Sequence, residues 1–93
     1  MAVPYGFAYV KPALDNLESI PKKFRRQIVR KIESLAGNPH PKGVKPVQGS
    51  TDGDNPIYRL RSGDYRILYC VRDAQTIVIL DIGNRKDIYR RSR

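Results

Sequence analysis

The chain has 93 residues, 40% of them hydrophobic, and its 18 lysines and arginines against nine acidic residues give a net charge of +9. This length predicts a single domain spanning residues 1–93, with a modest core and no room for a large internal cofactor cavity. The single cysteine, Cys70, excludes an internal disulfide and a metal cluster built from thiolates, and we expect no cofactor.

Charge and the N-terminal residues bear on partners and location. A pI near 10.1 predicts a polyanionic partner such as nucleic acid, a ribosome or an acidic protein, although a merely soluble basic domain would carry similar charge. No apolar run approaches the roughly 20 residues of a membrane-spanning helix. Pro4, Gly6 and Lys11 interrupt the N-terminal region, which lacks the pattern of a signal peptide. We therefore expect a cytoplasmic protein with no membrane partner.

The N-terminal part of the chain predicts a strand followed by a helix. Residues 3–10 alternate aromatic and small side chains, which is typical of a strand. Pro12 suits the first turn of a helix, and Leu14 and Leu17 give that helix an apolar stripe. Pro21 ends it and opens a second helix.

The second helix is strongly amphipathic. Its apolar residues recur at spacings of 4, 4 and 3, which places them on one helical face: Phe24, Ile28, Ile32 and Leu35. Basic residues cover the remaining surface: Lys22, Lys23, Arg25, Arg26, Arg30 and Lys31. Gly37, followed by Asn38 and Pro39, stops the helix. Two helices joined by a tight link predict a helical hairpin.

A glycine- and proline-rich stretch follows the hairpin. Residues 37–56 contain four glycines and four prolines, which predicts a long, irregular and mobile connection. It holds His40, the only histidine, between Pro39 and Pro41. Histidine is the commonest acid–base catalyst, but this setting favours a loop residue.

The C-terminal half predicts strands. Three segments are rich in aromatic and β-branched residues, and short reversals at 62–63 and 72–75 separate them: Ile57–Arg61, Tyr65–Val71 and Thr76–Ile82. They predict an antiparallel meander, which the first strand joins, and a basic tail over Arg85–Arg93 closes the chain. The expected fold is α+β, in the order β-α-α-β-β-β: a helical hairpin packed on one face of a small twisted, mainly antiparallel four-stranded sheet.

Strand register gathers arginines on one face. A hairpin centred between Ser62 and Gly63 pairs Arg59 with Arg66, and alternation places Arg61 on the same side. The opposite side is an apolar core face: Tyr58, Leu60, Tyr65, Ile67 and Tyr69. Like charges that face each other destabilise a sheet, so their retention favours a site for an anion.

Ordinary solvated arginines are the alternative. A second hairpin centred between Asp73 and Ala74 would pair Asp81 with Arg66 and account for that arginine alone. It leaves Arg59, Arg61 and Arg85, just past the last strand, without an explanation. We therefore favour the anion site.

RNA cleavage without a metal ion is one chemistry that such a site suits. The ribose 2′-hydroxyl must lose a proton, the phosphate charge must be neutralised, and the leaving 5′-oxygen must gain a proton. Arginine serves the second need but not the first, because it keeps its proton. Tyr89 is the best-placed proton carrier, although it could equally stack on a base or pin the C-terminus to the sheet.

Two segments carry a family resemblance. Residues 58–69 (YRLRSGDYRILY) and 82–90 (IGNRKDIYR) closely resemble the RelE-type toxins of the RelE/ParE toxin–antitoxin superfamily, and the helical hairpin and the link match too. The resemblance implies metal-independent cleavage of messenger RNA in the ribosomal A site. It also implies inhibition by a cognate acidic, RelB-like antitoxin, through which alone DNA would be contacted.

The resemblance also implies roles for individual residues. The catalytic set carried over by motif is Arg59, Arg61, Arg66, Arg85 and Tyr89. Arg66 and Arg85 would hold the scissile phosphate, and Tyr89 would orient or deprotonate the nucleophile or stack on a base. Arg59 and Arg61 would contribute field and a proton path. Contacts to RNA or the ribosome are expected from four further cations: Lys42, Lys45, Lys86 and Arg90.

One departure and two rival functions stand beside this prediction. Some members carry lysine where this chain has Arg59 and Arg61, and arginine cannot be tuned into an acid or base, which moves more of the chemistry to Tyr89. The rivals are a ParE-like toxin that binds DNA gyrase and cuts nothing, and a non-catalytic basic module that binds ribosomal RNA. The Arg85–Tyr89 tail beside the arginine face favours the nuclease.

Overall fold

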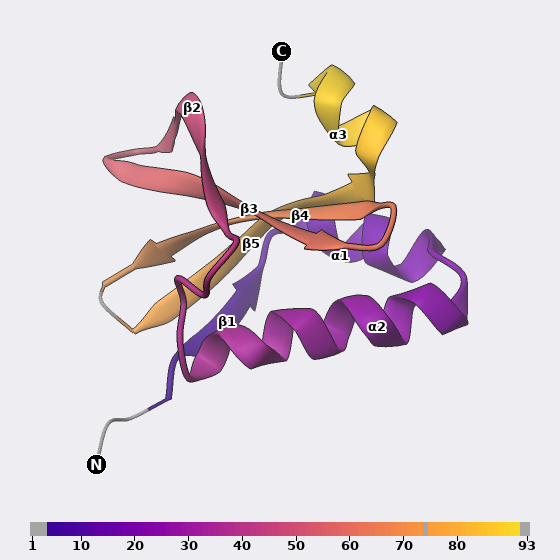
Figure 1. The fold of residues 1–93 in the computed structure, drawn as a ribbon, viewed down its shortest axis with the longest axis horizontal. Helices are drawn as coiled ribbons and strands as arrows, with labels where there is room; N and C mark the ends of the chain where they lie inside the picture. The colour runs from indigo at the N-terminus through magenta and orange to yellow at the C-terminus, as the bar shows by residue number, and fades with distance from the viewer. Residues whose placement is uncertain (1–3, 74, 92–93) are drawn as a thin grey trace.

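The computed structural model describes residues 4–73 and 75–91, and its chain forms a helical layer on a twisted sheet (Figure 1). In chain order the elements are β1 (Gly6–Tyr9), α1 (Lys11–Ser19), α2 (Lys22–Glu33), the 3-10 turn η1 (Ser34–Ala36), β2 (Lys45–Asp52), β3 (Asn55–Ser62), β4 (Tyr65–Arg72), β5 (Thr76–Asn84) and α3 (Arg85–Arg91). The sheet order is β1-β5-β4-β3-β2, with β1 parallel to β5 and all other pairs antiparallel.

The expected class is confirmed, with two additions to it. The fold is α+β, and the helical hairpin lies on one face of a mainly antiparallel sheet, but the sheet has five strands rather than four. Arg85–Arg91 of the predicted basic tail forms a helix, and it lies on the face opposite α1 and α2 (Figure 1). The predicted strand over residues 3–10 begins at Gly6. Predictions for residues 1–3, 74, 92 and 93 lie outside the described residues.

The added strand, β2, lies within the stretch that was expected to be irregular. Proline has no backbone N–H to donate, so within sheets it is tolerated mainly in edge strands. β2 is an edge strand of this sheet, and it can therefore contain Pro46. The pairing with β3 shifts register between Pro46 and Thr51, and Gly49 has a φ of +74°, a conformation that glycine adopts readily. Glycine and proline therefore mark an irregular edge strand.

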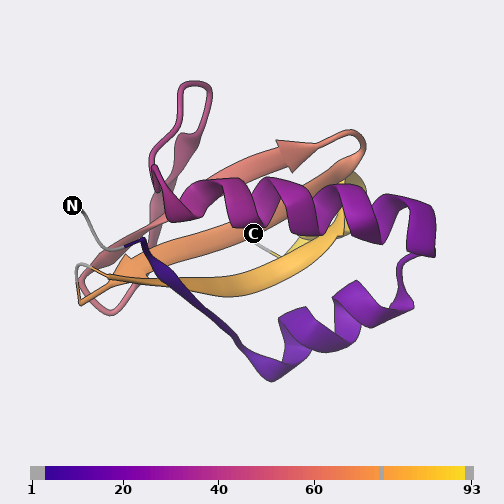
Figure 2. The same ribbon diagram turned by 90° about the horizontal axis from the view of Figure 1, so that it is seen from below.

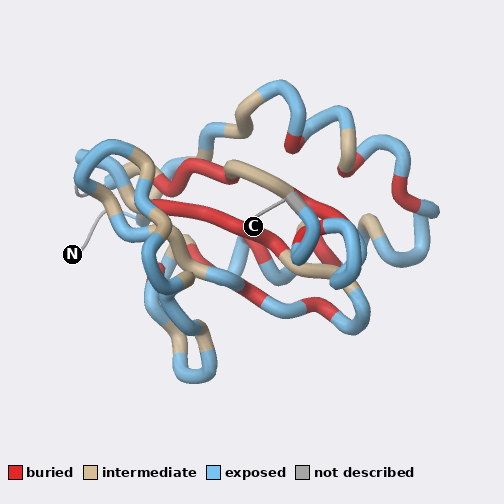
Figure 3. The backbone as a smooth tube through the Cα atoms, turned by 90° about the horizontal axis from the view of Figure 1, so that it is seen from above, coloured by how far each residue is buried: buried red, intermediate tan, exposed pale blue. Residues whose placement is uncertain are grey.

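The core lies between the helices and the inner face of the sheet. Figure 2 shows α1 and α2 crossing that face, and Figure 3 shows buried positions concentrated in the central strands and on the inner sides of the helices. Ile28, Ile32 and Leu35 are fully buried, which confirms the apolar face predicted for the second helix. Phe24 remains 39% exposed and packs against Tyr65, with ring centroids 5.7 Å apart.

The first hairpin has a different centre from the predicted one. Leu60 pairs with Ile67, and Arg61 rather than Arg59 pairs with Arg66, so the turn is Gly63–Asp64. Gly63 has a φ of +58°, which two-residue hairpins with glycine at the first turn position require. The error is two residues of register, and a strand has a side-chain period of two, so each arginine stays on its predicted face.

The predicted pair between Arg66 and Asp81 is wrong. The register of β4 and β5 shifts between Leu68 and Tyr69, which leaves Leu80 as an extra residue of β5. Arg66 consequently lies opposite Gly83, and Asp81 lies opposite Leu68. The Asp81 carboxylate instead accepts a hydrogen bond of 3.2 Å from the amide of Asn16 on α1.

Candidate functional site

A basic cleft of about 690 Å³ opens on the sheet face away from α1 and α2. We call it the arginine cleft, and its lining is Gly43, Lys45, Arg59, Arg61, Arg66, Arg85, Lys86, Tyr89 and Arg90. None of these residues is acidic, although the chain has nine aspartates and glutamates. The lining therefore suits a polyanion.

Three strands place cations side by side on the floor of the cleft. Lys45 of β2 pairs with Arg59 of β3, and Arg61 of β3 pairs with Arg66 of β4. Directly opposed residues have Cβ atoms only about 4.5–5.5 Å apart, so the like charges repel. A bound anion would relieve this repulsion.

Arg66 is the most constrained of these arginines. It is half-buried, and its Nη1 donates hydrogen bonds to the carbonyl oxygens of Gly63 at 2.8 Å and Tyr65 at 3.0 Å. Its Nε and Nη2 make no hydrogen bond to another described residue, which leaves donors for a ligand. Burial lowers the pKa of Arg66, and the positive charges of Arg61, Arg85 and Arg59 lower it further. The four guanidinium groups therefore lie close enough to share one positive field.

The wall of the cleft is α3. The carbonyl oxygen of Asp64 accepts a hydrogen bond of 2.8 Å from the Arg85 amide, and the Asn84 side chain accepts one of 3.0 Å from the Lys86 amide, which caps the helix. Ile88 is only 3% exposed and anchors α3, which contacts β5 and β4, whereas Tyr89 is 65% exposed. Burial of Ile88 therefore holds the helix on the sheet.

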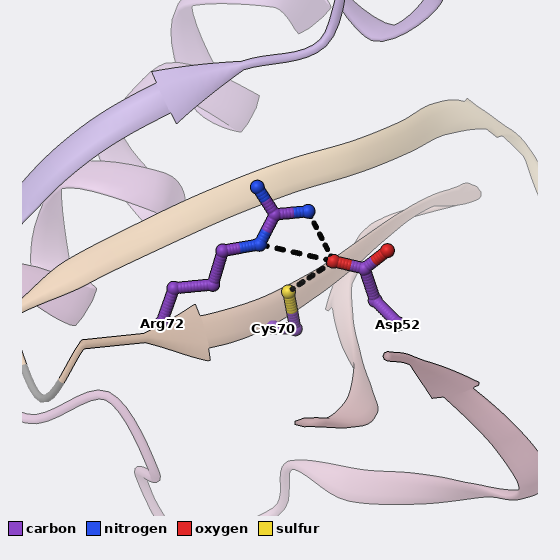
Figure 4. Close-up of polar contacts among 3 residues, drawn as sticks. All are labelled: Asp52, Cys70 and Arg72. Atoms are coloured by element: carbon purple, nitrogen blue, oxygen red, sulfur yellow. Dashed lines mark hydrogen bonds and ion pairs between the residues drawn. The ribbon is translucent and has the colours of Figure 1, made fainter. Parts of the chain in front are cut away.

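The outer strand β2 is tied down at its far end. One Asp52 carboxylate oxygen accepts hydrogen bonds from Nε of Arg72 at 3.1 Å, from the Arg72 Nη2, and from the Cys70 thiol at 3.5 Å (Figure 4). The bonds from Arg72 lower the pKa of Asp52. Asp52 belongs to β2 and its partners to β4, so the cluster reaches across β3 and holds the strand that carries Lys45.

His40 lies beside the core rather than in the cleft. Its ring packs edge-on against Tyr58 at 4.7 Å, and Tyr58 contacts Tyr69 at 5.6 Å. The buried Tyr69 hydroxyl donates a hydrogen bond of 2.5 Å to the Pro39 carbonyl oxygen. These contacts fix the connection between α2 and β2 on the sheet, and that connection leads directly to Gly43 at the cleft.

The cleft brings most of the predicted residues together. All five proposed catalytic residues line it, as do Lys45, Lys86 and Arg90, whereas Lys42 does not and its neighbour Gly43 does. Gly43 was not predicted, and its φ of +95° reflects a turn that local sequence marks only by the glycine itself. Within residues 4–73 and 75–91, no group of three histidine, cysteine or acidic side chains is arranged to hold a metal ion. No helix of this part of the chain is long and apolar enough to span a bilayer.

Comparison with known proteins agrees with the fold. The family described as the ParE toxin of the type II toxin–antitoxin system parDE matches residues 8–89. Toxin RelE of Mycobacterium tuberculosis is 32% identical over 89 residues, which cover 94% of this chain and 88% of that protein. The putative toxin RelE1 of Methanocaldococcus jannaschii is 32% identical over 84 residues, which cover 86% of this chain and 89% of that protein.

A solved structure supports the same assignment. The archaeal RelE–RelB complex from Pyrococcus horikoshii matches with a TM-score of 0.73 and 31% sequence identity, over 88% of this chain and 96% of that chain. Both the sequence similarity and the fold similarity extend over most of the chain, and the family match over residues 8–89 includes β2 to β5 and the first part of α3. The chain belongs to the RelE/ParE superfamily and is a RelE-type toxin of a type II toxin–antitoxin system.

Proposed function

We propose that this toxin is a metal-independent endoribonuclease that cleaves messenger RNA in the A site of the ribosome and so inhibits translation. The observation that carries the proposal is the arginine cleft, where five arginines and Tyr89 meet and no carboxylate lines the cleft. The 2′-oxygen attacks the adjacent phosphorus, the bond to the 5′-oxygen breaks, and the products are a 2′,3′-cyclic phosphate and a 5′-hydroxyl end.

Arg66 and Arg85 would bind the scissile phosphate. Charge-assisted hydrogen bonds from guanidinium groups strengthen as negative charge builds on the phosphate oxygens, and donors fixed in advance need no reorganisation. Arg66 fits this role because two backbone carbonyls already hold its Nη1. Arg59 and Arg61 would add to the positive field.

Tyr89 would orient or deprotonate the 2′-hydroxyl. It is the one lining residue with a side chain that both donates and accepts a proton, because the others are glycine, lysines and arginines. Its exposed ring could also stack on a base next to the scissile phosphate. In either role it contacts the substrate directly.

The partners follow from the same surface. The Pyrococcus horikoshii structure is a RelE–RelB complex, and for this chain we propose a cognate acidic, partly disordered RelB-like antitoxin. Complementary charge would bring it over the arginine cleft and block RNA. DNA would be contacted only through this antitoxin, and the protein would act on cytoplasmic ribosomes.

Mapping of RNA ends tests the proposal. After brief expression in bacteria, codon-phased 5′ ends should appear in translated messages, and purified ribosomes should be needed for the same cuts in vitro. Arg85→Ala and Tyr89→Phe should abolish the cuts and leave the fold intact. Lys11→Ala serves as the control, because it removes only the ion pair between the exposed side chains of Lys11 and Asp15. Supercoiling defects with intact messages would instead indicate a ParE-like gyrase inhibitor. If neither cleavage nor a supercoiling defect appears, the function that remains is a non-catalytic RNA-binding module.

A further inference from the structure

A second basic surface lies on the helical layer, away from the arginine cleft. α2 carries six basic residues and one acidic residue, Glu33, and its first turn has no acidic residue. Cations at a helix N-terminus oppose the helix dipole, which favours negative charge there. The dipole opposes Lys22 and Lys23 in the first turn but favours Arg30 and Lys31 in the last turn, so the helix itself stabilises these two cations.

A hollow beside α2 gives this charge a defined shape. It has a volume of about 480 Å³ and is lined by Gln27, Arg30, Lys31, Ser34, Ser62 and Gly63. The first four residues follow the spacing of one helical face, and the last two come from the end of the β3–β4 hairpin. We call this the α2 hollow. Figure 2 shows α2 passing the end of that hairpin.

The cations of the α2 hollow are available to a ligand. Arg30 and Lys31 are exposed, and neither forms an ion pair with another residue in the described part of the chain. The lining contains no acidic residue, and its other side chains are an amide and hydroxyls. This combination binds phosphate groups in proteins that hold nucleic acid backbones.

The α2 hollow and the arginine cleft share one turn. Gly63 lines the hollow, and its carbonyl oxygen accepts the 2.8 Å hydrogen bond from Arg66, which lines the cleft. Arg61 precedes Ser62 in the same hairpin and also lines the cleft. A strand that leaves the cleft around this turn would therefore meet Arg30 and Lys31.

We propose that the α2 hollow binds a backbone phosphate of the same RNA strand whose scissile phosphate lies in the arginine cleft. This inference rests on the proposed function, because it needs RNA in the cleft. Continuity around the β3–β4 turn favours the bound strand itself over a separate acidic polypeptide. The toxin would then grip its substrate at two places, on the two faces of one hairpin.

Binding of two lengths of uncleavable RNA tests this second grip. A 2′-O-methyl trinucleotide fills the cleft only, whereas a 2′-O-methyl dodecanucleotide can reach the hollow. Arg30→Gln with Lys31→Gln should weaken the dodecanucleotide about tenfold and reduce its salt slope by about 0.7 for each phosphate that the variant no longer neutralises. The trinucleotide affinity should not change. The matched control is Lys22→Gln with Arg26→Gln, which removes the same charge from exposed positions of α2 outside the hollow.

The remaining outcomes separate the possible failures. An equal loss for both lengths, or for the control pair, would show a diffuse field and overturn the second grip. If the hollow variant binds both oligonucleotides normally but binds a glutamate dodecapeptide more weakly, the hollow is assigned to a protein partner. If only its binding to ribosomes is weaker, the hollow is assigned to the structural RNA of the ribosome. If Arg66→Ala weakens neither oligonucleotide, the proposed function itself fails. If it weakens both while the hollow variant changes neither, only the second grip fails.

Discussion

Arg66 is held in position by the backbone carbonyls of Gly63 and Tyr65 before any ligand binds. Two carbonyl oxygens at 2.8 and 3.0 Å fix Nη1, and burial beside three other arginines lowers its pKa. A lysine at this position would keep the charge but lose the planar fork of donors. The contribution of Arg66 should therefore depend on geometry as well as on charge.

Substitution of Arg66 separates geometry from charge. Arg66→Ala should lower the single-turnover rate of RNA cleavage on programmed ribosomes by about 100- to 1,000-fold, the usual cost of losing a fixed donor at a developing anion. Arg66→Lys should recover only a small part of this loss. Circular dichroism should show an unchanged fold for both variants. Full recovery by lysine would mean that charge alone matters.

Tyr69 links the core to the connection that leads to the cleft. Its side chain is fully buried, and burial raises the pKa of its hydroxyl, with a further contribution from Tyr58. Tyr69→Phe would leave the Pro39 carbonyl oxygen without its 2.5 Å partner. We expect the free energy of unfolding in urea to fall by about 1–3 kcal/mol, the cost of an unpaired buried polar group.

The sign of the Tyr69 shift predicts an alkaline limit as well. A raised pKa in the folded state favours the neutral phenol, so the stabilisation is complete below the unfolded pKa of about 10 and is lost as pH rises above it. The wild-type protein should lose stability above this pH more steeply than Tyr69→Phe. Equal pH profiles would show that another group controls the alkaline transition.

At the scale of elements, β2 is held by its pairing with β3 and by a polar cluster at its far end. It is an edge strand with a register shift, and it carries Lys45 into the cleft. Asp52 ties it to Arg72 and Cys70 on β4 (Figure 4). An exposed ion pair contributes little to global stability, so its main effect should be local order.

Asp52→Asn tests this local role. Amide hydrogen exchange within 45–52 should become faster while the melting temperature changes little, because the strand loosens without unfolding of the core. The lowered pKa of Asp52 means that the tie is present above the unfolded pKa and is lost as pH falls through the lower folded pKa. Acid should therefore accelerate exchange in wild-type β2 but not in the variant. Unchanged exchange in Asp52→Asn at neutral pH would show that pairing with β3 suffices.

For the whole molecule, the net charge of +9 is divided between two faces. The arginine cleft occupies one face of the sheet, and the cations of α2 lie on the other layer. Such a distribution suits a protein that sits among RNA strands, since each face attracts phosphate groups over a Debye length of about 8–10 Å.

This distribution predicts a steep salt dependence. Raising monovalent salt from about 50 to about 200 mM should weaken binding to ribosomes by at least about tenfold, because each neutralised phosphate releases counterions. Fluorescence anisotropy of labelled toxin would measure the change. A gyrase-binding toxin would show a weaker dependence on salt for ribosomes than for gyrase.

The sequence by itself determined the helical hairpin, the meander and the face that carries the arginines. These features depend on side-chain periods: the spacing of Ile28, Ile32 and Leu35 marks one helical face, and a period of two keeps Arg59, Arg61 and Arg66 together even when the register slips by two residues. Local patterns survive small errors in pairing, which is why these predictions were confirmed.

Only the tertiary structure decided β2, α3 and the true neighbours of Arg66. The glycines and prolines of β2 are not typical of a strand, and this edge strand is ordered by its pairing with β3. The helix over Arg85–Arg91 is anchored by burial of Ile88 against the sheet, which lies outside the helix's own sequence. The shift at Leu80 likewise depends on how β5 packs, and it moved Asp81 away from Arg66. Contacts between distant residues set these features, because no local period specifies them.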